Sequence, residues 1–330
     1  MSVPLKIQIC GFLGLMALVA VPLTYAQSKN DQADKAQPSL HVPLASKAVF
    51  LDLAKAGDRI VAVGERGIIV FSDDDGRTWT QAKVPLRGTL TGVTFITDTT
   101  GIAVGHDSSI IRTDDGGATW SIVQFDPDAQ NVLLSVKFKN QTQGYITGTN
   151  GQLLITADGG ATWDTQTLAV EEWYQNHLFD IAWTDEATIV AAEKGVLYKS
   201  VGDVNQWSPL SSPYEGSYFG ALGLSSNDII IFGMSGRVYK SADSGTTWEQ
   251  VPTGTQQFLF DAARLPDGET LLVGAGGTLC TLAATDTRAD CQQRGTRVGF
   301  SAVLVDKDRV YLAASNGGIS SVLVEDIEAR

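Results

Sequence analysis

The stretch of sequence that decides the fold begins at Gly64 and ends at Trp79, and it reads Gly-Glu-Arg-Gly-Ile-Ile-Val-Phe-Ser-Asp-Asp-Asp-Gly-Arg-Thr-Trp. Three further stretches repeat it, at residues 105–120, 148–163 and 233–248. One worn copy and two half copies complete the set, at residues 192–207, 274–277 and 314–317. The copies follow one another every 40 to 44 residues. This regular period indicates a repeat architecture of seven units.

Each repeat contains four short runs rich in Val, Ile, Thr and Phe, separated by turns with Gly and Asp. In the second repeat these runs are residues 90–95, 101–105, 109–113 and 119–125. Such runs predict an antiparallel meander of four strands. One such sheet cannot bury both of its faces alone, but several sheets packed around an axis can. The sequence therefore predicts an all-β fold, a seven-bladed β-propeller of four-stranded antiparallel blades, with a solenoid of the same period as the alternative.

The second half of the repeat carries the motif [ST]-x-D-x-G-x-T-W, which is known as the Asp box or BNR repeat. Its four full copies contain Asp74, Asp115, Asp158 and Asp243. In a hairpin turn the carboxylate can accept backbone N–H bonds, the glycine can adopt a positive φ, and the tryptophan can pack between sheets. The later bidentate glutamate of a calcium loop is missing after Asp74. We therefore assign these four aspartates a structural role in the turns.

The period, the Val-Gly-x-x-Gly lead of the repeats and the Asp boxes together resemble the photosystem II stability/assembly factor-like propellers, a seven-bladed group. The resemblance covers roughly residues 40–330. It implies that the Asp boxes are scaffold, and that the protein is a non-catalytic assembly or accessory factor for a membrane or envelope complex. Many members from non-photosynthetic bacteria are encoded beside resistance-nodulation-division transporters. The resemblance therefore implies a protein client in or near the membrane, such as that transporter.

The first 26 residues have the layout of a secretory signal peptide. Lys6 precedes an uncharged apolar run over residues 7–23, and the small residues Thr24 and Ala26 stand at the −3 and −1 positions of a cleavage site. We expect cleavage after Ala26, a flexible leader over residues 27–39 and a periplasmic propeller over residues 40–330. An uncleaved membrane anchor is the alternative.

The charge and the scarcity of metal-binding residues exclude several classes of function. The sequence has 24 Lys and Arg against 37 Asp and Glu, a formal net charge of −13. This charge opposes binding to a phosphate backbone, so we expect no nucleic-acid partner. His41, His106 and His177 lie in different repeats, and no phosphate loop is present. We therefore expect a monomeric propeller without a metal site or a cofactor.

A glycoside hydrolase of the Asp-box type is the alternative function, and its site would lie on the innermost strands. We place these strands at residues 49–53, 90–95, 133–138, 179–183, 220–224, 260–264 and 300–305. They are mainly apolar, with Asp52, Lys137, Asp180, Asp261 and Arg264 as exceptions. Asp180 and Asp261 could form a carboxylate pair across the channel, as in a glycosidase. We interpret them as solvated channel residues and predict that the protein is not an enzyme.

The last repeat ends at residues 321–325 without a fourth strand that begins with Trp. Residues 37–44 resemble residues 81–86, which begin as the outer strand of the first blade. We therefore expect residues 40–44 to supply the outer strand of the seventh blade and to join the two ends of the propeller.

Cys280 and Cys291 are the cysteines that remain after removal of the signal peptide. In the repeat alignment they match Val70 and Gln81. A hairpin register that places Ser72 opposite Trp79 also places those two positions opposite each other. The sixth repeat has lost its Asp box there, so we predict a disulfide that staples the hairpin in an oxidising compartment. Two buried free thiols are the alternative.

In a propeller, the loops that join the blades emerge on one face and the Asp-box turns lie on the other. Two long joining loops, residues 168–178 and 210–219, combine aromatic and charged residues as protein interfaces do. Arginines from other loops give the same face a basic side. We expect a client to bind this face through Arg66, Arg87, Glu171, Glu172, Trp173, Tyr174, His177, Tyr214, Tyr218, Arg294 and Arg297. The alternative is that Trp173 and Tyr174 only plug the mouth of the ring.

Overall fold

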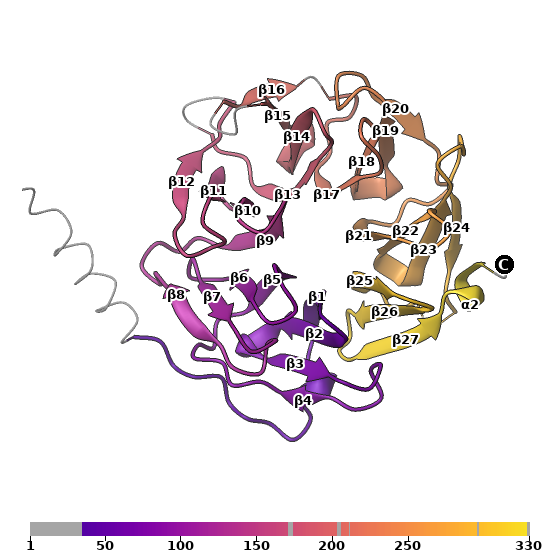
Figure 1. Ribbon diagram of the computed structural model, residues 1–330. Helices are drawn as coiled ribbons and strands as arrows, with labels where there is room; N and C mark the ends of the chain where they lie inside the picture. The colour runs from indigo at the N-terminus through magenta and orange to yellow at the C-terminus, as the bar shows by residue number, and fades with distance from the viewer. Residues whose placement is uncertain (1–34, 171–173, 203–205, 211, 296, 329–330) are drawn as a thin grey trace, which may run out of the picture.

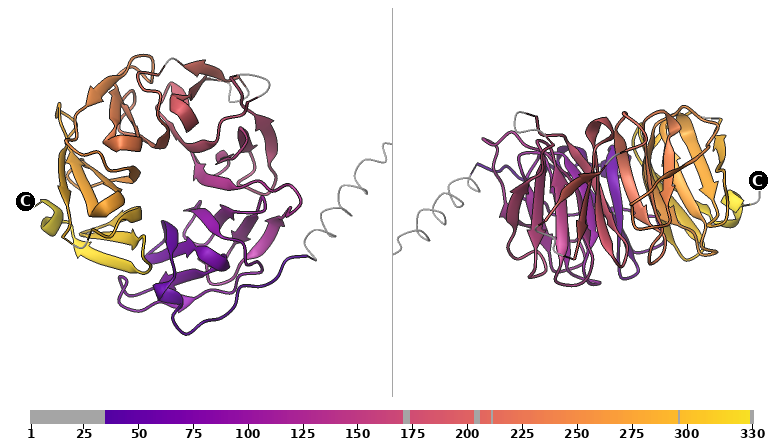
Figure 2. Two further views of the ribbon diagram at one scale, coloured as in Figure 1. Left: turned by 180° about the vertical axis from the view of Figure 1, so that it is seen from behind. Right: turned by 90° about the horizontal axis from the view of Figure 1, so that it is seen from above.

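The computed structural model describes residues 35–328 apart from residues 171–173, 203–205, 211 and 296. Its strands form seven antiparallel sheets around a central axis (Figure 1), and the view from above in Figure 2 shows this ring edge-on. The predicted seven-bladed propeller is confirmed. Within the described residues, no helix is long and apolar enough to cross a membrane.

In each blade the strands follow one another in sequence order from the centre to the rim. The innermost strands are β1 (Phe50–Ala56), β5 (Leu90–Phe95), β9 (Leu133–Phe138), β13 (Leu178–Trp183), β17 (Tyr218–Gly223), β21 (Leu259–Arg264) and β25 (Phe300–Asp306). The second strands are β2 (Arg59–Gly64), β6 (Gly101–Gly105), β10 (Gly144–Gly148), β14 (Ala187–Ala192), β18 (Ile229–Gly233), β22 (Thr270–Gly274) and β26 (Arg309–Ala314). They are almost wholly buried because both faces of each blade are covered.

The third strands are β3 (Ile69–Ser72), β7 (Ile110–Thr113), β11 (Gln152–Thr156), β15 (Leu197–Val201), β19 (Val238–Ser241), β23 (Thr278–Leu282) and β27 (Ile319–Leu323). Six blades add an outer strand: β4 (Thr80–Gln81), β8 (Ser121–Gln124), β12 (Asp164–Thr167), β16 (Ser208–Leu210), β20 (Glu249–Val251) and β24 (Asp290–Gln293). The sheet of the seventh blade has three strands, in the order β25-β26-β27.

Apolar clusters fill the seams between neighbouring blades, and a tryptophan lies at the outer part of five of them. Four of these tryptophans end a full Asp box, and Trp207 ends the worn repeat. Trp79 of the first blade, for example, packs against a cluster that joins Ile60 of that blade to Tyr311 of the seventh. Such an indole adds a large apolar area where two sheets diverge toward the rim. The five tryptophans in seams are Trp79, Trp120, Trp163, Trp207 and Trp248.

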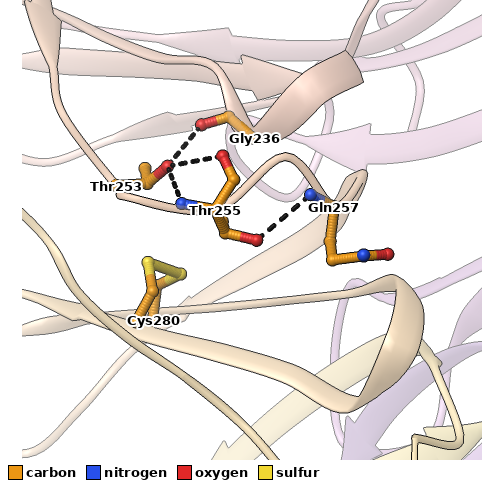
Figure 3. The surroundings of a disulfide bond; sticks show 6 residues. Gly236, Thr253, Thr255, Gln257 and Cys280 are labelled. Atoms are coloured by element: carbon orange, nitrogen blue, oxygen red, sulfur yellow. Dashed lines mark hydrogen bonds between the residues drawn. A yellow bond between two sulfur atoms is a disulfide. The ribbon is translucent and has the colours of Figure 1, made fainter.

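The two seams without such a tryptophan are filled in other ways. Cys280 is fully buried between the fifth and sixth blades and forms a disulfide with Cys291, its partner in the β23–β24 register, as the sequence predicted. Figure 3 shows this disulfide beside the segment that carries Thr253, whose hydroxyl donates to Gly236 O at 2.8 Å. Between the sixth and seventh blades, Val324 and Ile327 at the short helix α2 (Glu325–Glu328) enter the cluster.

The predicted closing strand at residues 40–44 was wrong. These residues form no strand, and the preceding segment runs along the outside of the first blade, where Ser39 N–H donates to Val84 O at 3.0 Å. The Gln81 side chain holds the segment because its amide donates to Leu40 O at 2.8 Å and its Oε1 accepts Val42 N–H at 2.9 Å. The similarity of residues 37–44 to the outer strand therefore reflects attachment beside that strand.

The ring closes without this strand. Lys55 on β1 pairs with Asp306 on β25, and Gly318 N–H donates to Ala48 O at 2.8 Å next to η1 (Ala45–Lys47). The shared apolar cluster around Tyr311 completes the contact between the first and seventh blades.

Six of the seven turns between second and third strands have glycine at one position, and in most of them a carbonyl oxygen of the next joining segment lies against it; the second blade has Ser108 there, with a φ of 50°. Gly195, in η3 (Glu193–Gly195), has a φ of 73°, and a Cβ added there would lie 1.9 Å from Tyr214 O. A Cβ added at Gly67, in η2 (Glu65–Gly67), would lie 2.2 Å from Leu86 O.

Substitution of alanine at Gly195 should therefore cost much more than the same substitution at Gly202. Gly202 has a matching φ of 74°, but no atom lies within 4 Å of its added Cβ. Both variants carry the backbone cost of roughly 1 kcal/mol, and Gly195→Ala adds overpacking of roughly 1–3 kcal/mol. Urea unfolding monitored by tryptophan fluorescence measures both. Equal losses in the free energy of unfolding would contradict the proposed crowding at Gly195.

Thiol titration of the chain without residues 1–26, denatured but not reduced, should find no free thiol, and reduction should release two. The double variant Cys280→Ser with Cys291→Ser should lose about 2–4 kcal/mol of unfolding free energy, because the cross-link restricts the unfolded chain. Two thiols before reduction would show that the cysteines are unpaired.

Candidate functional site

The two faces of the ring differ in which backbone segments are hydrogen-bonded to each other. Turns between second and third strands bond to the segments that join blades, as where Glu65 N–H donates to Val49 O at 3.0 Å. Asp-box turns bond instead to the turns between first and second strands, as where Gly116 N–H donates to Thr99 O at 2.9 Å. We call the first surface the loop face and the second the Asp-box face. The predicted division of the loops between two faces is therefore correct.

At the channel mouth on the loop face, aromatic rings of three consecutive blades meet. Phe179, Phe219 and Phe260 occupy the second position of β13, β17 and β21, and Phe258 and His177 precede two of these strands. Neighbouring ring centroids lie 5.3 to 6.5 Å apart, mostly edge to face. Phe258 and Phe260 are 39% and 37% exposed. We call these five residues the aromatic patch.

Four of these five residues were missed by the sequence analysis. The signal was present, because aligned repeats place Phe at the same inner-strand position in three consecutive blades and Leu, Thr or Ser in the others. An innermost strand is expected to be apolar, so the phenylalanines did not stand out from ordinary core residues.

Tyr174 and His177, both predicted binding residues, lie around η3 on the loop face. The Tyr174 hydroxyl donates to Glu193 Oε2 at 2.9 Å, and Lys194 Nζ lies 4.0 Å from the centre of its ring. His177 Nδ1 accepts Asn150 N–H at 3.2 Å. Residues 171–173, with the predicted Glu171, Glu172 and Trp173, lie outside the described residues.

The predicted tyrosines of the next loop do not both reach the surface. Tyr218 is fully buried, and its hydroxyl lies 2.7 Å from Ser212 Oγ, so the prediction that it contacts a partner needs correction. Tyr218 is the first residue of β17, where the side chain points into the seam. Tyr214 is half-buried, with its ring 6.1 Å from that of Tyr218 and under the guanidinium of Arg237.

Two of the four predicted arginines come together, and the other two lie on another loop. Arg66 and Arg87 are exposed and line an apolar groove of about 520 Å³ with Leu40 and Leu44. Arg294 and Arg297 lie in the segment that joins the sixth and seventh blades, where Arg297 N–H donates to Arg294 O at 3.0 Å. The loop face therefore carries cations at two separate places.

The Asp-box aspartates are held in their turns as the motif predicts. The Thr78 hydroxyl donates to Asp74 Oδ2 at 2.6 Å, and Thr78 N–H and the Ser72 hydroxyl donate to Asp74 Oδ1, each at 2.8 Å. These donors, Thr78 first, lower the pKa of Asp74 to about 2. The same bonds recur at Asp115, Asp158 and Asp243. No group of three or more His, Cys, Asp or Glu in the described chain could hold a metal ion.

The channel carboxylates join neighbouring blades, so the interpretation of Asp180 and Asp261 as solvated channel residues was wrong. Asp52 Oδ2 accepts the N–H of Val93 on the second blade at 2.8 Å, and Asp261 Oδ2 accepts the N–H of Val303 on the seventh at 2.8 Å. Asp180 Oδ2 accepts Ala221 N–H at 3.0 Å.

Lys137 neutralises part of the negative charge of these channel carboxylates. Its Nζ lies 2.7 Å from Asp180 Oδ2 and donates to Ala221 O at 3.3 Å. Burial, followed by the charge of Asp261, raises the pKa of Asp52 to about 8. Burial also raises the pKa of Asp261 to about 6. The cavity between these residues measures about 120 Å³, well below the roughly 300–1,000 Å³ of ordinary ligand pockets.

Comparison with known proteins agrees with this architecture. The family model described as photosynthesis system II assembly factor YCF48 matches residues 122–320. The chain belongs to this family. No curated protein matches it.

Solved structures show the same fold at low sequence identity. "YCF48 bound to D1 peptide" has a TM-score of 0.68 and 17% identity, over 88% of this chain and 98% of that one. YCF48 from Cyanidioschyzon merolae has a TM-score of 0.67 and 14% identity, over 88% and 100%. The WD40 propeller domain of Doa1 reaches 0.67 at 10% identity, over 87% and 95%.

Stability should fall as the pH rises, because Asp52 is protonated in the folded protein up to about pH 8 but ionises near its ordinary pKa of 3.8 in the unfolded chain. Between these values the folded state holds the extra proton, so the free energy of unfolding decreases toward high pH. Asp261 acts in the same direction only up to about pH 6. Melting temperatures between about pH 5 and 8 check this.

Two variants separate the contributions of Asp52 and Asp261 to this pH dependence of stability. Asp52→Asn should remove the decline between about pH 6 and 8. Asp261→Asn should make the decline below about pH 6 shallower and should end the remaining decline at a lower pH, because the charge of Asp261 helps to raise the pKa of Asp52. An unchanged slope above about pH 6 in Asp52→Asn would show that Asp52 is not the titrating group.

Proposed function

We propose that this protein is an exported, non-catalytic platform that binds a protein client during assembly of a membrane or envelope complex. The aromatic patch is the observation that carries the proposal. It places half-exposed phenylalanine rings on a rigid ring scaffold at the mouth of the channel, where large side chains can be desolvated by a partner. Tyr174 and the four predicted arginines add polar and charged groups elsewhere on the loop face.

The family supports a protein rather than a small molecule as the ligand. In one of the similar solved structures, YCF48 is bound to a D1 peptide. We extend this to a peptide segment of the client here, and we propose a membrane protein such as a resistance-nodulation-division transporter as that client. The propeller acts as a monomer in this proposal.

Export to the periplasm, with cleavage after Ala26, is part of the same proposal. It is supported by the charge and apolar pattern of residues 1–26. The Cys280–Cys291 disulfide supports it independently, because disulfides persist mainly in oxidising compartments.

The channel favours the platform over a glycoside hydrolase. Asp180 already binds Lys137 Nζ, the Ser135 hydroxyl and Ala221 N–H, and Asp261 binds two backbone N–H groups. These carboxylates hold blades together in a cavity too small for a sugar chain. They are therefore committed to the scaffold.

The double variant Phe258→Ala with Phe260→Ala should reduce client capture about tenfold or more, because aromatic anchors contribute more than 1 kcal/mol each at interface centres. Capture is measured by quantitative mass spectrometry of proteins retained from solubilised native envelopes. Val201→Ser is the matched control, since Val201 is 65% exposed at the end of β15 on the Asp-box face. Unchanged capture by the double variant, with loss in the control, would place the site on the other face.

A further inference from the structure

The seventh blade has an open edge at the position where the other six carry a fourth strand. Ala314 N–H donates to Gly318 O at 3.0 Å, which sets the alternation of bonds between β26 and β27. Because of this alternation, the backbone N–H and C=O groups of every second residue of β27 point away from β26. These residues are Ile319, Ser321 and Leu323. In the first blade the residue equivalent to Ile319 is Ile69, whose carbonyl accepts Ala82 N–H of the outer strand at 2.9 Å.

Within the described part of the chain, no group bonds to this outer edge of β27. Lys35, where the description begins, pairs with Asp128 at 2.8 Å, in the segment between the second and third blades. Residues 38–42 lie along the first blade. After Leu323 the chain turns into α2, where Val324 and Ile327 are buried in the seam toward the sixth blade. Figure 1 shows β27 at the rim with α2 at its end.

The side chains along β27 leave room for another strand. Ser320 and Ser321 at its centre are small and exposed, and they point to opposite faces of the sheet. Ile319 and Val322, on either side of them, already belong to the clusters of the two flanking seams. Apolar side chains of an added strand would therefore extend both clusters over the two serines.

The charges at the two ends of β27 differ. The exposed acids Asp308, Glu325 and Asp326 lie at its C-terminal end, where Val324 N–H donates to Asp308 O at 2.8 Å. Two cations lie at the same end, Arg309 opposite Leu323 and Lys307 in an ion pair with Asp58, so the acids remain in excess there. At the other end the Lys47 side chain lies beside Gly318. An antiparallel strand would begin at the acidic end and finish near Lys47. Basic residues at its start would be complementary to this edge.

We propose that β27 accepts an extended segment of a partner protein as an antiparallel fourth strand, and that this segment begins with basic residues and continues with β-branched ones. The unpaired backbone groups provide the affinity, and the acidic end sets the direction and register. A second copy of this chain fits less well, because two molecules with a net charge of −13 repel each other. The site lies on the rim and does not depend on the loop face.

A fluorescent peptide of two lysines followed by alternating valine and threonine is the probe, with binding to the wild-type protein followed by anisotropy. The peptide should bind, and its reversed sequence, with the lysines last, should bind about tenfold more weakly. N-methylation of the alternate amides that face β27 should abolish binding, whereas methylation of the other alternate set should not. Equal binding of both methylated peptides, or no binding of any peptide, would overturn the proposal.

Protein variants test the edge from the other side. Ser321→Pro removes an outward N–H but no bond to β26, so it should weaken binding about tenfold, and Ser321→Thr should bind as wild type. Glu325→Lys should weaken binding of the lysine-first peptide more than that of the reversed one. If Ser321→Pro lowers the melting temperature, its weaker binding could come from damage to the fold. In that case the N-methylated peptides on the wild-type protein decide whether β27 accepts a strand. Sedimentation of the wild type as a dimer that Ser321→Pro makes monomeric would show that a second copy occupies the edge.

Discussion

The structure depends on burial of both faces of every blade against its neighbours, because a four-stranded sheet of Val, Ile and Leu is apolar on both sides. The blades diverge toward the rim, so the outer part of each seam needs a wedge. A tryptophan of an Asp box supplies it in four seams, Trp207 of the worn repeat in a fifth, the Cys280–Cys291 hairpin in the sixth, and Val324 with Ile327 in the seventh. The worn repeats thus retain the wedge by other chemical means.

The two faces of the ring differ in how their polar groups are satisfied. On the Asp-box face, each carboxylate of the four boxes is saturated by hydroxyl and amide donors of its own turn. On the loop face, the backbone of the turns is bonded to the joining segments, while the side chains of Arg66, Phe258 and Phe260 remain exposed. A rigid backbone with exposed aromatic and charged side chains loses little conformational entropy when a partner binds.

The channel serves the same rigidity. Asp52, Asp180 and Asp261 each accept a backbone N–H of the next blade, so the centre of the ring is joined by hydrogen bonds as the rim is joined by apolar wedges. Desolvation of these carboxylates makes the bonds strong but the charged form costly, which is why Lys137 lies among them. The raised pKa values therefore follow from a structural role.

The sequence by itself determined the number of blades, the strand order, the Asp-box turns, the division of the loops between two faces and the Cys280–Cys291 register, because each follows from local patterns that can be aligned between the repeats. It did not reveal the aromatic patch, since Phe179, Phe219 and Phe260 lie about 40 residues apart and meet only when the ring closes. Nor did it place residues 40–44 or the buried Tyr218 correctly. Only the tertiary structure decided these, because a strand-like segment can attach to either side of the closing seam, and an aromatic side chain can point into a seam or out of it, with the choice made by packing against blades distant in sequence.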